Sequence, residues 1–282
     1  MSPDFWVILT GILAAAACGL IGSFLVLRQQ AMLGDAISHA VLPGLVIAFL
    51  ITSSRNVLPM IIGAGVMGLV TAFLAGLLSN TGRLYKDASL AVVFTFLFSV
   101  GVILVSLYTG QIDLDQECVL YGEIAYTPWD TFVISGINYG PRSIWILGGM
   151  FVADLLFIIL FYKQLKICSF DPQLARSVGI SSKLWHYLLM TMVSLTVVAA
   201  FESVGAILVV AMLIIPGATA YLLTRRLRLM LILSVLVGVT CAVGGFYGAS
   251  LFNTSIAGFM AVAGGLVFAL VVLVVKVGWI AS

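Results

Sequence analysis

Long apolar runs dominate this sequence and restrict the folds open to it. Of its 282 residues, 62% are hydrophobic and only 9% are charged, whereas an average soluble domain has about 25% charged residues. The runs are about 20 residues long, the length a helix needs to cross a hydrocarbon layer. They are continuous and lack the alternation over about 10 residues that is typical of barrel strands. The sequence therefore predicts an all-α, polytopic membrane bundle.

Nine candidate spans divide the chain, which we treat as a single transmembrane domain over 1–282. Only Glu202 and Ser203 separate the sixth span from the seventh, so one of the two is alternatively a half-helix, and eight full spans is the alternative count. Pro216, within the seventh, is expected to weaken or kink that helix. The predicted spans are 5–27, 31–53, 57–79, 88–108, 143–162, 184–201, 204–223, 229–250 and 256–278.

The distribution of Lys and Arg predicts the orientation, because cytoplasmic loops carry an excess of basic residues. Threading nine spans with the N-terminus outside places eleven basic residues on the cytoplasmic side and leaves only Arg55 and Arg142 outside. The C-terminus is then cytoplasmic. The net charge of +2 gives no reason to expect a nucleic-acid partner, and the four cysteines lack metal-type spacing.

An acid and an imidazole stand inside the second apolar run, in the stretch 34–44. Asp35 and His39 are four residues apart, so a helix places both side chains on one face. If Arg28 marks the inner edge, the two lie about 10 Å and 16 Å into the membrane at 1.5 Å per residue. Pro43 cannot donate to the carbonyl of His39 and leaves that oxygen without its helix partner. Intramembrane ionisable residues indicate a functional site.

A carboxylate, an imidazole and a carbonyl oxygen suit a first-row divalent cation, and the absence of a thiolate argues against copper(I). The residue types do not decide among manganese, iron and zinc. Two protein ligands are too few, so others come from elsewhere, including a second subunit. The alternative is that Asp35 and His39 pair with each other for stability. Candidates for an additional pathway or gate role are Glu202, Asp154 and Ser38, with an interhelical hydrogen bond as the alternative for Asp154.

Two polar connections interrupt the spans. The outer one, 109–142, is predicted to carry a short amphipathic helix and is either an electronegative vestibule or an ordinary solvated loop. Its acids are Asp113, Asp115, Glu117 and Glu123.

The cytoplasmic connection, 163–183, is predicted to carry one short exposed helix. Asp171 and Pro172 give a cap followed by proline at the first helical position, and Gly179 is a helix stop. Leu174, Ala175 and Val178 form an apolar stripe that fits either a partner surface or the membrane interface.

Known catalytic motifs are missing. The sequence has no phosphate-binding Gly-x-x-x-x-Gly-Lys-Ser/Thr loop and no His-Glu-x-x-His zinc motif. Ser38 and His39 are adjacent and do not face each other on a helix. We therefore expect a non-enzymatic chain with no permanently bound cofactor, so any ATP hydrolysis takes place in a separate subunit.

Four stretches carry a family resemblance that covers nearly the whole chain. The stretch Gly34–Gly44 closely resembles the signature of permease subunits of bacterial ATP-binding-cassette importers for manganese, zinc and iron. The stretch 115–126 is similar to the manganese branch, 171–180 resembles the family's coupling helix, and 204–217 matches another family block.

The resemblance implies a multi-pass permease in the bacterial cell membrane that imports Mn²⁺, or alternatively Zn²⁺ or Fe²⁺. Its implied partners are ATPase subunits docked on the coupling helix, a metal-delivering extracellular lipoprotein, a second permease subunit and membrane lipid. It also implies that Asp35 and His39 bind the ion. An ion-coupled secondary transporter is the rival hypothesis; a membrane enzyme and a sensor subunit are weaker ones.

Overall fold

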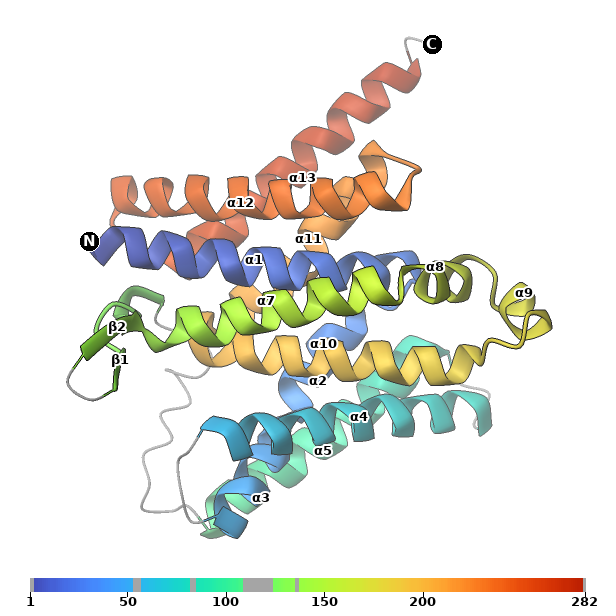
Figure 1. The fold of residues 1–282 in the computed structure, drawn as a ribbon, viewed down its shortest axis with the longest axis horizontal. Coiled ribbons are helices and arrows are strands. Elements are labelled where there is room, and N and C mark those ends of the chain that lie inside the picture. The colour runs from blue at the N-terminus through green and yellow to red at the C-terminus, as the bar shows by residue number, and fades with distance from the viewer. Residues whose placement is uncertain (1–2, 53–56, 82–84, 109–123, 135–136, 281–282) are drawn as a thin grey trace. The chain divides into compact units, whose positions relative to one another are not determined.

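The computed structural model describes all residues except 1–2, 53–56, 82–84, 109–123, 135–136 and 281–282, and the described part is mostly helical (Figure 1). The helices are α1 (Pro3–Leu27), α2 (Met32–Ala40), α3 (Leu42–Thr52), α4 (Val57–Thr81), α5 (Lys86–Tyr108), α7 (Arg142–Leu160), α8 (Tyr162–Phe170), α9 (Pro172–Ser177), α10 (Ser182–Val204), α11 (Ala206–Leu223), α12 (Leu227–Phe252) and α13 (Ile256–Ile280), with a 3-10 turn η1 (Ile124–Tyr126).

The helices fall where the apolar runs predict them. Among the described residues, eight helical stretches are long and apolar enough to cross a membrane, with α2 and α3 together forming one of them. Helix α4 is 25 residues long, and its Gly65–Ser79 part is apolar. The predicted all-α membrane bundle with eight to nine spans is therefore confirmed. The orientation of the two termini stays a prediction.

The sixth and seventh spans join differently from the prediction. Helix α10 continues through Glu202 and Ser203 to Val204, and the chain turns at Gly205, whose φ is 81°. Helix α11 then runs for 18 residues with Pro216 inside it. Both helices are long and apolar enough to span a membrane, so the structure gives no support to the half-helix alternative. The backbone breaks at the glycine because its conformation, with ψ 163°, is essentially reserved for glycine.

A small hairpin in the outer connection was not predicted. Strand β1 (Thr131–Ile134) pairs antiparallel with β2 (Ile137–Pro141), with Thr131 opposite Pro141. Most of the amphipathic helix expected in this connection lies outside the described residues.

The contacts between Cα atoms divide the chain into two compact units. Unit 1 comprises residues 1–29, 117–162 and 199–282, and unit 2 comprises residues 30–116 and 163–198. The expectation of one transmembrane domain stays a prediction.

Unit 1 is built around α1, which packs against α7, α11 and α12 (Figure 1). Small residues allow this close approach. The backbone of Gly22 lies directly against that of Leu213, and a Cβ at Gly217 would lie 3.1 Å from the Cα of Ser23. Lipid tails are as apolar as the side chains, so the hydrophobic effect does not drive helices together in a membrane. Close van der Waals contacts at small residues therefore provide much of the packing between membrane helices.

Unit 2 holds α2, α3, α4 and α5 together with most of α10. Helices α3 and α4 approach through Gly44 and Gly63. The Ser194 hydroxyl of α10 donates to the carbonyl of Gly65 at 3.3 Å, which fixes α10 against α4. Helix α2, which carries the Asp and His pair, itself packs against α4 and α5.

Candidate metal site

Helix α2 presents Asp35 and His39 on one face, as their spacing predicts. The His39 Nε2 and Asp35 Oδ1 atoms are 3.6 Å apart, and the side chains are 36% and 42% exposed, respectively. Every other residue from Leu33 to Ala40 is buried. The distance is too long for a strong hydrogen bond. The pair is therefore close enough to share a cation, and it points out of unit 2.

Two aromatic rings of α5 hold the imidazole. The ring of His39 has its centroid 5.9 Å from that of Phe94, tilted by 31°, and 5.9 Å from that of Phe98, nearly perpendicular at 82°. Phe94 and Phe98 are themselves four residues apart and share a face of α5. This contact restricts the rotation of the imidazole while leaving it partly exposed.

The break between α2 and α3 lies beside this pair. Helix α2 ends at Ala40 and α3 begins at Leu42. The amide of Val41 still donates to the carbonyl of Ile37, at 3.1 Å, and the helix is interrupted at Val41, two residues before Pro43. Since proline has no N–H, it cannot bond the carbonyl of His39. The predicted interruption is therefore present.

Ser38 does not face the pair. It is buried, and its hydroxyl donates to the carbonyl of Gly34 at 2.9 Å within the same helix. A hydroxyl bonded in this way serves the helix backbone. The structure therefore gives no support to Ser38 as a pathway or gate residue.

Asp154 and Glu202 belong to unit 1. Asp154 is fully buried in α7 and has an interaction partner. Glu202 is partly exposed on α10, within electrostatic range of Arg142 and Asp130. Over the part of the chain that the structure describes, no group of three His, Cys, Asp or Glu side chains is arranged to hold a metal.

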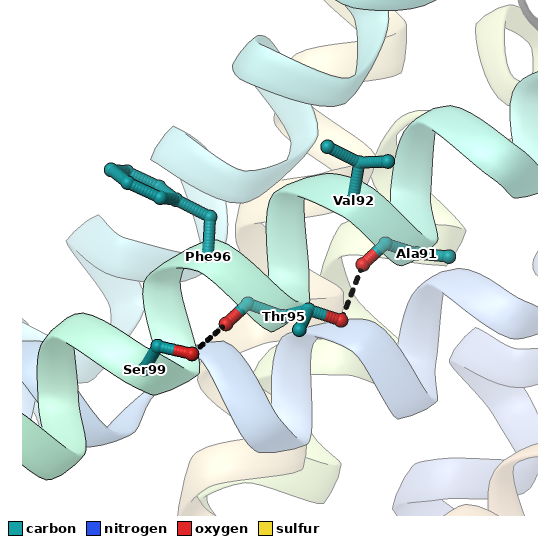
Figure 2. Close-up of a pocket in the computed structure, with 5 residues that line it drawn as sticks. All are labelled: Ala91, Val92, Thr95, Phe96 and Ser99. Carbon is teal, nitrogen blue, oxygen red and sulfur yellow. Dashed lines mark hydrogen bonds between the residues drawn. The ribbon is translucent and has the colours of Figure 1, made fainter.

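An open hollow of about 450 Å³ lies on α5, the helix that packs against His39. Figure 2 shows the residues that line it. Its polar groups are two hydroxyls that bond their own helix: Thr95 donates to Ala91 and Ser99 donates to Thr95, each at 2.8 Å. Val92 and Phe96 complete the lining. The sequence predicted α5 as a span but not its part in the site, because the apolar pattern of α5 does not reveal which of its faces meets α2.

The cytoplasmic connection contains the predicted capped helix. Asp171 Oδ1 accepts from the amides of Gln173 and Leu174, at 3.0 and 2.9 Å, and Pro172 occupies the first turn of α9. Gly179, with φ 80°, follows the helix end. The cap, the proline and the stop are confirmed.

Two details of this connection differ from the prediction. It contains a second helix, α8, in place of a loop. In the apolar stripe, Leu174 and Val178 are exposed, but Ala175 is fully buried, because it lies on the inner side of α9. The outer acids Asp113, Asp115, Glu117 and Glu123 lie outside the described residues.

Comparison with known proteins provides a family for this arrangement. A sequence model described as the ABC 3 transport family matches residues 4–276. The chain is 52% identical over 269 residues to the manganese transport system membrane protein MntD of Bacillus subtilis, covering 95% of this chain and 91% of that protein. It is 43% identical over 267 residues to the zinc transport system membrane protein TroD of Treponema pallidum, covering 95% and 72%.

The fold is also similar to a solved structure, PsaBC from Streptococcus pneumoniae in complex with Fab. The TM-score is 0.79 at 32% identity, and the match covers 96% of this chain and 91% of that one.

Proposed function

The chain belongs to the ABC 3 transport family, and we propose that it is the membrane permease subunit of an ATP-driven importer whose cargo is the manganese ion. It is a multi-pass membrane protein of the bacterial plasma membrane. The names of the MntD relative and of a second relative, MntC, support manganese, and the name of the TroD relative makes zinc the second candidate.

The proposal depends on one observation, the partly exposed Asp35 and His39 pair at the surface of unit 2. Both belong to a stretch apolar enough to span a membrane, yet both are more than a third exposed. Ionisable side chains in a membrane face a water-filled path or another protein surface, because contact with lipid is costly. A carboxylate and an imidazole 3.6 Å apart can then bind a divalent cation in such a path.

A second permease subunit provides the simplest completion of this site. Two ligands from one chain leave most of the coordination shell of Mn²⁺ open, and a copy related by twofold symmetry adds a second carboxylate and a second imidazole. Such an isologous interface is the commonest kind among soluble homo-oligomers. Water molecules then supply the remaining ligands.

Uptake of radioactive manganese into cells tests the site. The variants Asp35→Ala and His39→Ala are expected to lose at least about 10–100-fold in uptake, the loss typical of removing even the outer-shell partners of metal ligands. His186→Ala is the matched control, since His186 packs on Tyr187 within α10 and lies outside the pair. Intact uptake in well-expressed His39→Ala cells would refute the assignment.

Helix α9 is the proposed docking point for the ATPase subunit. Its cap fixes a short helix that presents Leu174 and Val178 to a partner. The variant Leu174→Glu is expected to abolish co-purification of the ATPase. Leu251→Glu makes the same change at an exposed leucine near the C-terminal end of α12 and is expected to leave co-purification of the ATPase intact. Equal co-purification in both variants contradicts the docking proposal.

The outer connection is the proposed contact for a metal-delivering lipoprotein, on the strength of its four acids. An ion-coupled transporter predicts manganese uptake into vesicles that contain this chain alone. The ATP-driven importer predicts uptake only when the ATPase and ATP are present.

A further inference from the structure

Two arginines lie in the short connection between α11 and α12, and a third lies in the first turn of α12. Helix α11 ends at Leu223 and α12 begins at Leu227. Arg225, Arg226 and Arg228 are all exposed, and we refer to these three as the arginine connector. The turn itself is fixed, because the amide of Arg226 donates to the Thr224 hydroxyl at 3.2 Å.

The chain provides no nearby compensation for this charge. Residues 206–282 contain no Asp and no Glu. Across the described residues, none of the three guanidinium groups has a carboxylate oxygen within 4.0 Å. Exposed arginines on proteins often pair with neighbouring acids. Three arginines within four positions that have no carboxylate partner among the described residues therefore form a site with an unmet preference for an anion.

One of the guanidinium groups is held in place by an aromatic ring. The Cζ atom of Arg228 lies 5.5 Å from the ring centroid of Tyr162, at the start of α8. A guanidinium stacked on an aromatic face is attracted to it and keeps its planar N–H donors free at the edge. The connector thus has one guanidinium oriented by an aromatic ring, on Arg228, and two exposed ones, on Arg225 and Arg226.

An apolar face begins next to these charges. On α12, Leu229, Ile232 and Leu236 are spaced i, i+3 and i+7, and all three are exposed. On α11, the exposed Leu222 and Leu223 immediately precede the connector. The surface therefore changes from strongly basic to wholly apolar within one residue, at the end of two spanning helices.

We infer that the arginine connector binds the phosphate headgroup of an anionic phospholipid, whose acyl chains lie along the exposed face of α12. A lipid matches both parts of the surface at once: a negative head for the arginines and a hydrocarbon tail for the leucines. Basic residues beside a membrane helix attract anionic lipids. An acidic protein surface would match only the charges.

Native mass spectrometry of the permease purified with its ATPase tests this inference, with dioleoylphosphatidylglycerol as the probe. Removing all three charges in Arg225→Gln/Arg226→Gln/Arg228→Gln is expected to weaken lipid binding by roughly 100-fold, at about fivefold for each arginine. Tyr162→Leu is expected to weaken it about 2–5-fold, and Tyr162→Phe, which keeps the ring, to leave it unchanged. Lys276→Gln is the control for loss of a positive charge elsewhere in unit 1.

Dioleoylphosphatidylcholine and inorganic phosphate distinguish the sources of the interaction. The inference holds if phosphatidylglycerol binds and the other two do not. Equal binding of phosphatidylcholine, or displacement of the lipid by phosphate alone, overturns it. A triple variant that keeps its lipid but loses the ATPase also overturns it, because the connector is then a protein contact. If the triple variant does not fold, Arg228→Gln alone replaces it. This variant is expected to weaken phosphatidylglycerol binding roughly fivefold, and unchanged binding overturns the inference.

Discussion

The approach of α3 to α4 gives the sharpest test of how the site is supported. At Gly63, a Cβ atom would lie 2.6 Å from the carbonyl oxygen of Gly44 and 2.7 Å from the Cβ of Ala48. Ordinary contacts begin near 3.4 Å, so the two helices must separate by about 0.8 Å in Gly63→Ala. The neighbouring atoms are backbone and a methyl group, and neither can rotate away.

Overpacking of this kind costs about 1–3 kcal/mol, which shifts the unfolding equilibrium by roughly 5–150-fold. Thermal unfolding of the purified permease, followed by tryptophan fluorescence, measures the effect. At about 2–4 °C for each kcal/mol, the midpoint of Gly63→Ala is expected to fall by roughly 2–12 °C. Manganese uptake should fall as well, since α3 begins three residues after His39.

Gly76 provides the matched control on the same helix. A Cβ there meets no atom within 4 Å among the residues that the structure describes, and alanine gains up to about 1 kcal/mol in helix propensity over glycine. Gly76→Ala should therefore melt at or above the wild-type midpoint. If Gly63→Ala melts no lower than Gly76→Ala, the close approach of α3 and α4 is wrong.

Three further predictions concern separate parts of the chain. His39→Gln should keep the expression of the wild type and lower the melting temperature only slightly while losing manganese uptake, because the imidazole is partly exposed and contacts only two ring faces; a large fall in stability would instead assign it a structural role. Asp171→Ala should destabilise α9 by about 0.5–2 kcal/mol through loss of its cap, seen as faster amide hydrogen exchange at Gln173 and Leu174, and unchanged exchange would refute the cap. Gly205→Ala should cost about 1–3 kcal/mol through its positive φ, measured by thermal unfolding against Gly149→Ala, whose Cβ meets nothing nearby among the described residues.

Much of the site was predictable because its geometry is local. The spacing of Asp35 and His39 places them on one helical face, and the missing N–H of Pro43 interrupts the backbone ladder beside them. The cap at Asp171 and the stop at Gly179 also depend only on neighbours in sequence. In each case the interacting groups are within four residues, so regular helix geometry fixes their separation.

The sequence by itself determined that the chain spans a membrane, roughly where its spanning helices lie, and which two ionisable residues share a face. Only the tertiary structure decided that this face points out of unit 2, that Phe94 and Phe98 hold the imidazole, and that Ala175 is buried while Leu174 is not. It also moved the break between α10 and α11 to Gly205. The physical reason is that apolar residues surround a membrane helix on all sides, so hydrophobic periodicity cannot distinguish lipid from a neighbouring helix. Which face meets which partner depends on close contacts between residues far apart in sequence, such as Gly44 with Gly63.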